Sequence, residues 1–210
     1  MLVATLALGI GNVRSVVRAL AQASEGRAEI VTTADPDVVR RADAIIAPGQ
    51  GAFGSVASAV GARGMSEALV EAIRAGKPYF GICLGLQVLF EASAEDEGAK
   101  GLGIFAGRVE RLAPGLDTTT GRAHALPHIG WNRAEPVRDG LVTGDHYYFA
   151  HTFAAVPVDP AVILAQTTYG TASFVSAVAR DNVVGIQFHP EKSQRAGLAV
   201  LGRFFAQTRA

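Results

Sequence analysis

One cysteine, Cys83, stands where a thiol could act as a nucleophile. It is the centre of the run Gly81-Ile82-Cys83-Leu84-Gly85, between a segment typical of a buried strand and one typical of a helix. Small residues two positions on either side are what the tight strand-to-helix turn of a nucleophile elbow requires. A helix N-terminus favours the thiolate, and the Leu84 N–H would face the same space and stabilise an oxyanion. The alternative is that Cys83 is a small buried apolar residue, as free cysteines often are.

A histidine and a carboxylate two residues apart form the second candidate group. His189 and Glu191 flank Pro190, which favours an extended segment in which residues i and i+2 project to the same side. A carboxylate beside an imidazole fixes its tautomer and stabilises the imidazolium. We therefore predict Cys83 as nucleophile, His189 as base and Glu191 as the acid that orients it. A loop histidine with a neighbouring acid is the alternative, and the cysteine elbow weakens it.

A glycine-rich segment, PGQGAF at residues 48–53, follows a predicted strand at residues 44–47. It should lie at the same sheet edge as Cys83, because parallel strands end together. Its glycines permit a backbone change that presents a second oxyanion N–H, around Gln50 and Gly51. On this segment alone, a simple turn is an equally good interpretation.

The elements that must position these residues alternate between strand and helix in the first half. We predict strands at residues 2–8, 29–33, 44–47 and 79–82, and helices starting near 13, 36, 65 and 84. The second half predicts strands at 107–112, 147–152, 162–168, 174–179 and 183–188, a hairpin turn at 180–182, and a final helix at 194–207. The fold class is α/β: a single domain over residues 1–210, with a central mixed, mostly parallel sheet flanked by helices.

Composition limits the class of protein. The 210 residues carry no net charge, which argues against a nucleic-acid partner and a polybasic membrane patch. No apolar run approaches the roughly 20 residues of a membrane-spanning helix. One cysteine excludes an intrachain disulfide framework and a Cys-based zinc site, so a cytoplasmic location is expected.

The chain offers no place for a phosphate or a metal. There is no GxxxxGK[ST] loop, and Arg14 replaces the third glycine of a dinucleotide-like pattern that starts at Gly9. His124 and His128 are four apart, but Pro127 removes the helical geometry that would make them joint ligands. We expect no cofactor and no metal.

These motifs together resemble the class I, triad-type glutamine amidotransferases. Several longer runs sharpen the resemblance to one subfamily, the glutaminase subunits of imidazole glycerol phosphate synthase in histidine biosynthesis. These runs are GNVRSV at 11–16, PGQGAF at 48–53, GICLGLQ at 81–87, PHIGWN at 127–132, YFAHTF at 148–153 and GIQFHPEKSQRAGL at 185–198. PHIGWN and FHPEKS discriminate the subfamily, whereas the elbow is shared by many amidotransferases.

The resemblance implies a reaction and a substrate site. Cys83 would attack the side-chain amide of glutamine to form a γ-glutamyl thioester. His189 would protonate the leaving ammonia and then activate water, while Glu191 orients it. Further residues match positions that hold glutamine: Gln87 and Glu95, expected in the helix after the elbow, Gly51, and the backbone of Thr152 and Phe153.

The resemblance also implies a partner. Ammonia would travel to a separate (βα)8 cyclase subunit in a 1:1 heterodimer. There it would join a ribulosyl-aminoimidazole nucleotide and give imidazole glycerol phosphate and an aminoimidazole carboxamide nucleotide. The interface candidates are Asn12, His128, Trp131 and Asn132.

The chain departs from the usual family pattern at Gln50, where the oxyanion loop often has Val, and at Ala7-Leu8, where an Asp-Tyr pair is common.

Two other interpretations of the function remain. One is the glutaminase of a pyridoxal phosphate, anthranilate or GMP (purine) synthase, against which PHIGWN argues. The other is a catalytically silent structural subunit, against which the intact Cys83, His189 and Glu191 argue.

Overall fold

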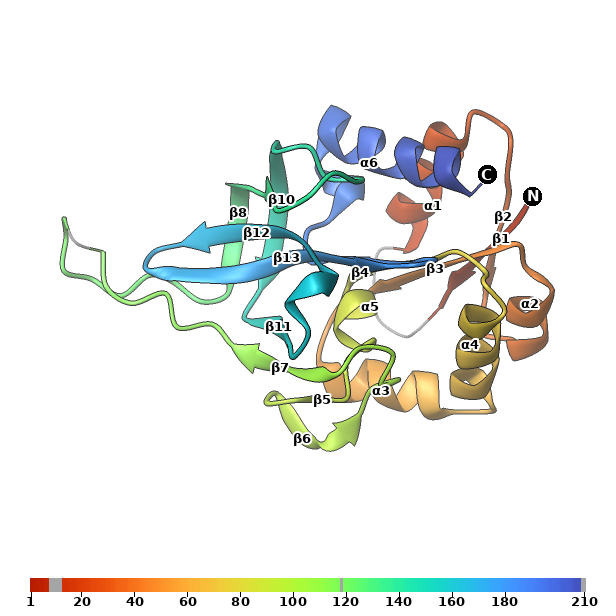
Figure 1. Ribbon diagram of the computed structural model, residues 1–210, viewed down its shortest axis with the longest axis horizontal. Helices are drawn as coiled ribbons and strands as arrows, with labels where there is room; N and C mark the ends of the chain where they lie inside the picture. Colours follow the sequence, from red (N-terminus) through yellow and green to blue (C-terminus); the bar gives the residue numbers. More distant parts are fainter. Residues whose placement is uncertain (8–12, 118, 209–210) are drawn as a thin grey trace.

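The main sheet of the computed structural model has eight strands, in the order β2-β1-β3-β4-β14-β13-β12-β9 (Figure 1). The structure describes residues 1–7, 13–117 and 119–208. The strands from β2 to β14 run parallel, and β13, β12 and β9 continue the sheet antiparallel, which confirms the mixed sheet expected. The bounds are β1 Leu2–Leu6, β2 Glu29–Thr33, β3 Ala44–Gly49, β4 Tyr79–Cys83, β9 Glu135–Pro136, β12 Ile163–Tyr169, β13 Ala172–Arg180 and β14 Val183–Ile186.

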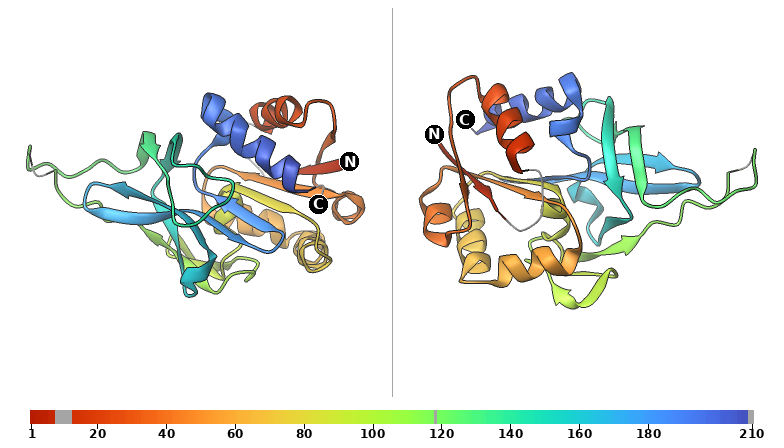
Figure 2. Two further views of the ribbon diagram at one scale, coloured as in Figure 1. Left: turned by 45° about the horizontal axis from the view of Figure 1, so that its top comes forward. Right: turned by 180° about the vertical axis from the view of Figure 1, so that it is seen from behind.

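Helices cover both faces of this sheet, as the two views of Figure 2 show. On one face, α1 (Val13–Ser24) and α6 (Gln194–Gln207) join the strands in one apolar cluster. On the other, a second cluster includes α2 (Pro36–Arg41), α3 (Phe53–Gly61), α4 (Met65–Arg74) and the short α5 (Leu84–Gln87). Because both faces are covered, β3 and β4 are buried along their whole length.

Two smaller sheets lie away from the chain termini (Figure 1). One has the order β11-β7-β5-β6 and the other pairs β10 with β8. Two of the strands expected in the central sheet, β7 and β10, thus belong to separate sheets. Their bounds are β5 Ala92–Ser93, β6 Asp96–Lys100, β7 Gly107–Arg111, β8 His128–Arg133, β10 His146–His151 and β11 Phe153–Pro157; two 3₁₀ turns, η1 (Pro160–Val162) and η2 (Pro190–Lys192), complete the elements.

Local sequence signals explain several element ends. The Asp35 carboxylate accepts the Asp37 N–H at 2.8 Å and caps α2, which begins at Pro36 as predicted. Strand β3 continues through Pro48 and Gly49, contrary to the expectation that they would stop it. The reason is that β3 pairs with β1 only as far as Ile46, whereas its pairing with β4 continues to Gly49. Proline is tolerated at position 48 because no hydrogen bond to β1 requires an N–H there.

The close packing of the elbow on β3 gives a first prediction. A Cβ at Gly85 would overlap the carbonyl group of Ala47. We expect Gly85→Ala to lower the free energy of unfolding by about 3 kcal/mol, because neither backbone segment can move freely. Gly202, inside α6, has no atom within 4 Å of such a Cβ. Gly202→Ala should therefore raise stability by up to about 1 kcal/mol. Urea unfolding of both variants checks this, and equal stabilities would contradict the packing described.

Among the described residues, no helix combines the length and the apolar character needed to cross a lipid bilayer.

Candidate active site

Cys83 lies on the sharp turn between β4 and α5. Its backbone angles, φ 55° and ψ −107°, are ones that a side-chain-bearing residue rarely adopts. A Cβ at Gly81 would collide with the carbonyl of Gly85 four residues on, so the turn has room only for glycine there. The structure thus has the strand–turn–helix that the glycine spacing predicts. The strain at Cys83 is of the kind that concentrates at functional sites.

His189 follows β14 and is fixed by backbone contacts to β10. Its N–H donates to the Tyr148 carbonyl at 2.8 Å. The Ser193 hydroxyl donates to the His189 carbonyl at 2.6 Å and accepts the Tyr148 N–H at 2.9 Å. Residues 190–192 form the 3₁₀ turn η2, not the extended segment expected, because Pro190 at its first position favours starting a helical turn.

The His189 and Glu191 side chains form a buried pair. His189 Nδ1 lies 2.9 Å from Glu191 Oε1, and the side chains are only 3% and 1% exposed. A proton on Nδ1 donates to the carboxylate and leaves Nε2 to exchange a proton with the thiol. Burial disfavours the charged imidazole, but hydrogen bonds to Cys83 and Glu191 and the charges of these groups outweigh it and raise the His189 pKa to about 10.

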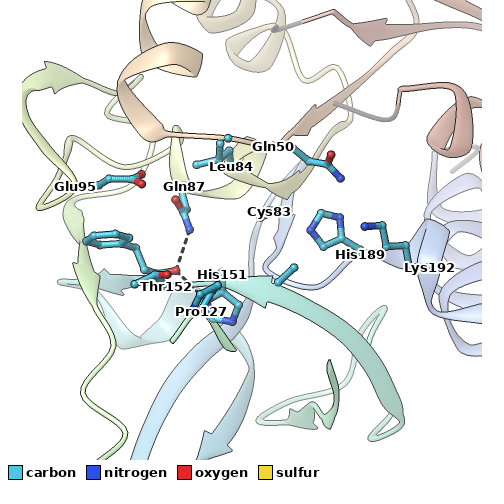
Figure 3. A pocket seen from close by; sticks show the side chains of 13 residues that line it. Gln50, Cys83, Leu84, Gln87, Glu95, Pro127, His151, Thr152, His189 and Lys192 are labelled. Atoms are coloured by element: carbon cyan, nitrogen blue, oxygen red, sulfur yellow. Dashed lines mark hydrogen bonds between the residues drawn. The ribbon is translucent and has the colours of Figure 1, made fainter. Parts of the chain in front are cut away.

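A cavity of about 380 Å³ opens beside this group (Figure 3). His189 and Lys192 stand on one side of it, and Gln87 and Glu95 on the other. The structure thereby brings the candidate nucleophile, base, oxyanion and substrate-binding residues to one place. The lining residues are Gln50, Gly51, Cys83, Leu84, Gln87, Glu95, Pro127, Ala150, His151, Thr152, Phe153, His189 and Lys192.

The two side chains expected to hold substrate come from different elements. Gln87 is the last residue of α5 and is 2% exposed. Its Nε2 donates to the Phe153 carbonyl at 3.0 Å, and its Oε1 is buried with no partner among the described residues. The sequence led us to expect Glu95 in the helix after the elbow. It lies outside that helix, because α5 ends at Gln87. It lies between β5 and β6, where its carboxylate accepts the Phe53 N–H at 2.8 Å.

With this geometry in view, the chain can be compared with known proteins. A family model described as glutamine amidotransferase class-I matches residues 8–208. The chain belongs to this family. Two similar relatives are both named imidazole glycerol phosphate synthase subunit HisH. The one from Pyrococcus furiosus is 41% identical and the alignment covers 96% of this chain and 97% of that protein. The one from Aquifex aeolicus is 42% identical, with 93% and 92% covered.

Solved structures of other amidotransferases share the fold. A crystal structure of a glutamine amidotransferase matches with a TM-score of 0.74 at 22% identity, over 98% of this chain and 97% of that one. The glutaminase domain of Trypanosoma brucei CTPS matches with a TM-score of 0.68 at 16% identity, over 100% and 94%. At these identities the likeness concerns the fold of the amidotransferase domain.

The four interface candidates of this amidotransferase lie in different environments. Trp131 is 48% exposed and Asn132 half-buried, both on β8. His128 is only 3% exposed, so its side chain lies beneath the face that Ile129 and Trp131 present. The reason is the strand alternation: His128 lies on the inner face of β8, whereas Ile129 and Trp131 are on the outer one. Asn12, like Leu8, lies outside the described residues.

His128 forms a buried pair with His151. His128 Nδ1 lies 3.3 Å from His151 Nε2, and His151 Nδ1 lies 2.9 Å from the Phe153 carbonyl. Because a carbonyl only accepts, His151 carries its proton on Nδ1, and His128 must donate from its own Nδ1. Asn132 Nδ2, 3.3 Å away, then donates to His128 Nε2. Burial lowers the pKa of His128 to about 4 and of His151 to about 3, so both are neutral.

This pair gives a pH prediction. In the unfolded chain a histidine takes up a proton below about pH 6.5, whereas folded His151 does so only near pH 3. Stability is therefore expected to fall as the pH drops from 6.5 towards 3, by at most about 5 kcal/mol for His151. His151→Gln should flatten this dependence, whereas His146→Gln, on an exposed histidine, should not. Urea unfolding at several pH values measures it, and identical slopes in all three proteins would contradict the prediction.

One further side chain at the site was not predicted from the sequence. Gln187 is fully buried, and its Nε2 lies 3.5 Å from the Cys83 sulfur. It stands two residues before His189 and within the strand predicted at residues 183–188, so strand alternation places it on the same side as His189 and could have revealed it.

Proposed function

We propose that this chain is the glutaminase subunit of an imidazole glycerol phosphate synthase in histidine biosynthesis. It would convert glutamine and water into glutamate and ammonia. The single observation that carries the proposal is one cavity lined by Cys83 and by His189, whose Nδ1 is held by Glu191 at 2.9 Å. The relatives named HisH support the choice of synthase. The only cysteine is then a catalytic thiol that must stay reduced, which fits a reducing cytoplasm.

The chemistry proceeds in two acyl transfers. A pKa of about 10 keeps His189 charged at neutral pH, with a proton on Nε2, so the Cys83 sulfur attacks the side-chain carbonyl carbon of glutamine as the thiolate. The C–N bond then breaks, His189 gives that proton to the departing nitrogen, and a γ-glutamyl thioester with ammonia remains. Water, deprotonated by His189, attacks the thioester and releases glutamate and the free thiol. Glu191 keeps the imidazole in the tautomer that both steps need and stabilises its cation.

The oxyanion of each tetrahedral intermediate would sit at the start of α5. Leu84 follows the nucleophile directly, so its N–H is the first donor. The second comes from the segment of Gln50 and Gly51, which lines the same cavity at the end of β3. Donors fixed where negative charge develops stabilise the transition state more than the substrate.

The far side of the cavity would hold the amino-acid end of glutamine. An ammonium group needs acceptors, and Gln87 Oε1 is a buried acceptor with no partner among the described residues. The Glu95 carboxylate adds a negative charge on the same side. Gly51 and the backbone of Thr152 and Phe153 complete the lining.

The outer face of β8 and β10 would receive the partner, a (βα)8 cyclase subunit in a 1:1 complex. Ile129 and Trp131 are 61% and 48% exposed there. Trp131 faces Tyr148 across the two strands, with ring centroids 6.2 Å apart. Neighbouring exposed apolar side chains favour a protein interface. Ammonia would pass through the partner to its nucleotide substrate.

The test is glutamate release from glutamine by the full chain, measured alone, with the cyclase subunit, and with the cyclase plus its nucleotide ligand. We expect release to be strongest with the liganded partner. Trp131→Ala should weaken this stimulation, whereas Val158→Ala, at a residue 75% exposed just after the end of β11, should leave it unchanged. Release that ignores the cyclase would contradict the choice of synthase, and no release under any condition would contradict the glutaminase itself.

A further inference from the structure

A chain of hydrogen bonds other than the His189–Glu191 pair reaches the nucleophile. Gln87 Nε2 donates to the Phe153 carbonyl and to Gln187 Oε1, at 3.0 Å each. Gln187 Nε2 then points its N–H at the Cys83 sulfur, 3.5 Å away. Gln87 and Gln187 are 2% and 0% exposed, so water does not compete for these groups. None of these contacts is needed by a triad of cysteine, histidine and glutamate.

The direction of this chain is fixed by one backbone group. The Phe153 carbonyl can only accept, so the Gln87 amide must turn its nitrogen towards it. The same nitrogen faces Gln187, which must therefore present its oxygen to Gln87 and its nitrogen to sulfur. Turning either amide over would set two nitrogens or two oxygens against each other.

The buried histidine pair strengthens this arrangement at its far end. The His151 Nδ1–H donates to the same Phe153 carbonyl at 2.9 Å. His151 is neutral and tied to His128, whose own acceptor nitrogen takes the Asn132 N–H. A carbonyl held by two donors keeps its position when substrate enters the cavity that it borders.

We propose that Gln187 is a further catalytic residue, whose side-chain N–H donates to the Cys83 sulfur and stabilises the thiolate that attacks glutamine. The proposal rests on the proposed function in that it takes Cys83 as the nucleophile. A thiolate gains more from a donor than a thiol does, because hydrogen bonds to ionised acceptors are the stronger ones. His189 and Gln187 then supply donors to one sulfur, and the amide, unlike the imidazole, does not titrate.

The chain offers a clean test, because Cys83 is its only cysteine. The rate of alkylation by iodoacetamide, measured against pH on the full chain, reports the thiolate of Cys83 alone. Gln187→Met keeps an uncharged side chain of similar length but has no N–H. We expect it to raise the pH midpoint of alkylation by about one unit or more. The kcat for glutamate release, measured with the partner, should fall about tenfold, with KM for glutamine nearly unchanged.

Ser176→Ala is the matched control. Ser176 is a fully buried neighbour whose backbone carbonyl accepts the Gln187 N–H, and its hydroxyl has no partner among the described residues. This variant should leave the midpoint and kcat unchanged. If circular dichroism shows that Gln187→Met does not fold, Gln187→Leu replaces it, because its side chain is also uncharged and has no N–H.

The outcomes separate this inference from the proposed function. A folded Gln187 variant with the wild-type midpoint would overturn the role of Gln187, and a raised midpoint with normal Ser176→Ala behaviour supports it. The proposed function is tested by the glutaminase activity of the wild-type protein alone. If alkylated wild-type protein keeps its glutaminase activity, Cys83 is not the nucleophile, whatever the midpoints are.

Discussion

Cys83→Ala is expected to lower glutamate release from glutamine by about 10⁴-fold or more, even with the liganded partner present. The reason is that no other group at the site can form the acyl intermediate. The other lining side chains with a nucleophilic atom include Glu95, Thr152, His189 and Lys192, and none of them stands on the elbow turn next to the Leu84 N–H. The measurement is the initial rate of glutamate formation.

Two further readouts make this loss specific. Cys83→Ala removes one sulfur atom from a residue only 6% exposed, so thermal unfolding should be nearly that of the wild type. Product formation by the complex should also return when ammonia is supplied directly, because ammonia bypasses the glutaminase step. A complex that fails with ammonia as well would show that the variant damages the assembly. Glutaminase activity that survives the substitution would contradict the mechanism.

Glu191→Gln is expected to lower kcat by about 10²- to 10⁴-fold. Its side chain is 1% exposed and contacts His189 Nδ1 at 2.9 Å. An amide can donate its own N–H to Nδ1, which moves the imidazole proton to Nε2 and prevents it from accepting the thiol proton. The loss of a carboxylate also removes one of the interactions that raise the His189 pKa, so this pKa should fall.

The loss of stability caused by Glu191→Gln is expected to depend on pH. A His189 pKa of about 10 in the folded protein, above the 6.5 of the unfolded chain, contributes stability that is fully present below pH 6.5 and is lost as the pH rises towards 10. The destabilisation by Glu191→Gln should therefore be largest below pH 6.5 and shrink towards pH 10. Glu110→Gln, at a surface carboxylate 2.6 Å from Arg108, is the control and should change neither kcat nor this profile. An equal loss at every pH would contradict the role given to Glu191.

The elbow could be predicted from the sequence because its constraint is local. Glycines two residues before and after Cys83 are required by backbone overlap within a few residues and with the adjacent β3. The boundaries of α4 and α6 and the cap of α2 were equally accessible, since their apolar spacing and Asp35 act within single elements. The resemblance to a family then supplied the substrate and the partner.

Features that depend on distant contacts were not accessible in this way. Glu95 reaches the site because its carboxylate takes the N–H of Phe53, 42 residues earlier in the chain. The sequence of strand β8 is compatible with a strand or a loop, and pairing with β10 makes it a strand. That pairing buries His128, and nothing local to the PHIGWN run indicates which of its faces is covered.

The most direct test of the central claim is to trap the acyl-enzyme. Wild-type chain, liganded partner and glutamine are mixed, quenched in acid within one turnover and digested, and the peptide that contains Cys83 is analysed by mass spectrometry. Our account predicts one γ-glutamyl group on this peptide, more of it in His189→Asn if thioester formation persists there, and none in Cys83→Ala. Glutamate formed at the full rate with no glutamyl group on Cys83, or with one on another residue, would contradict it.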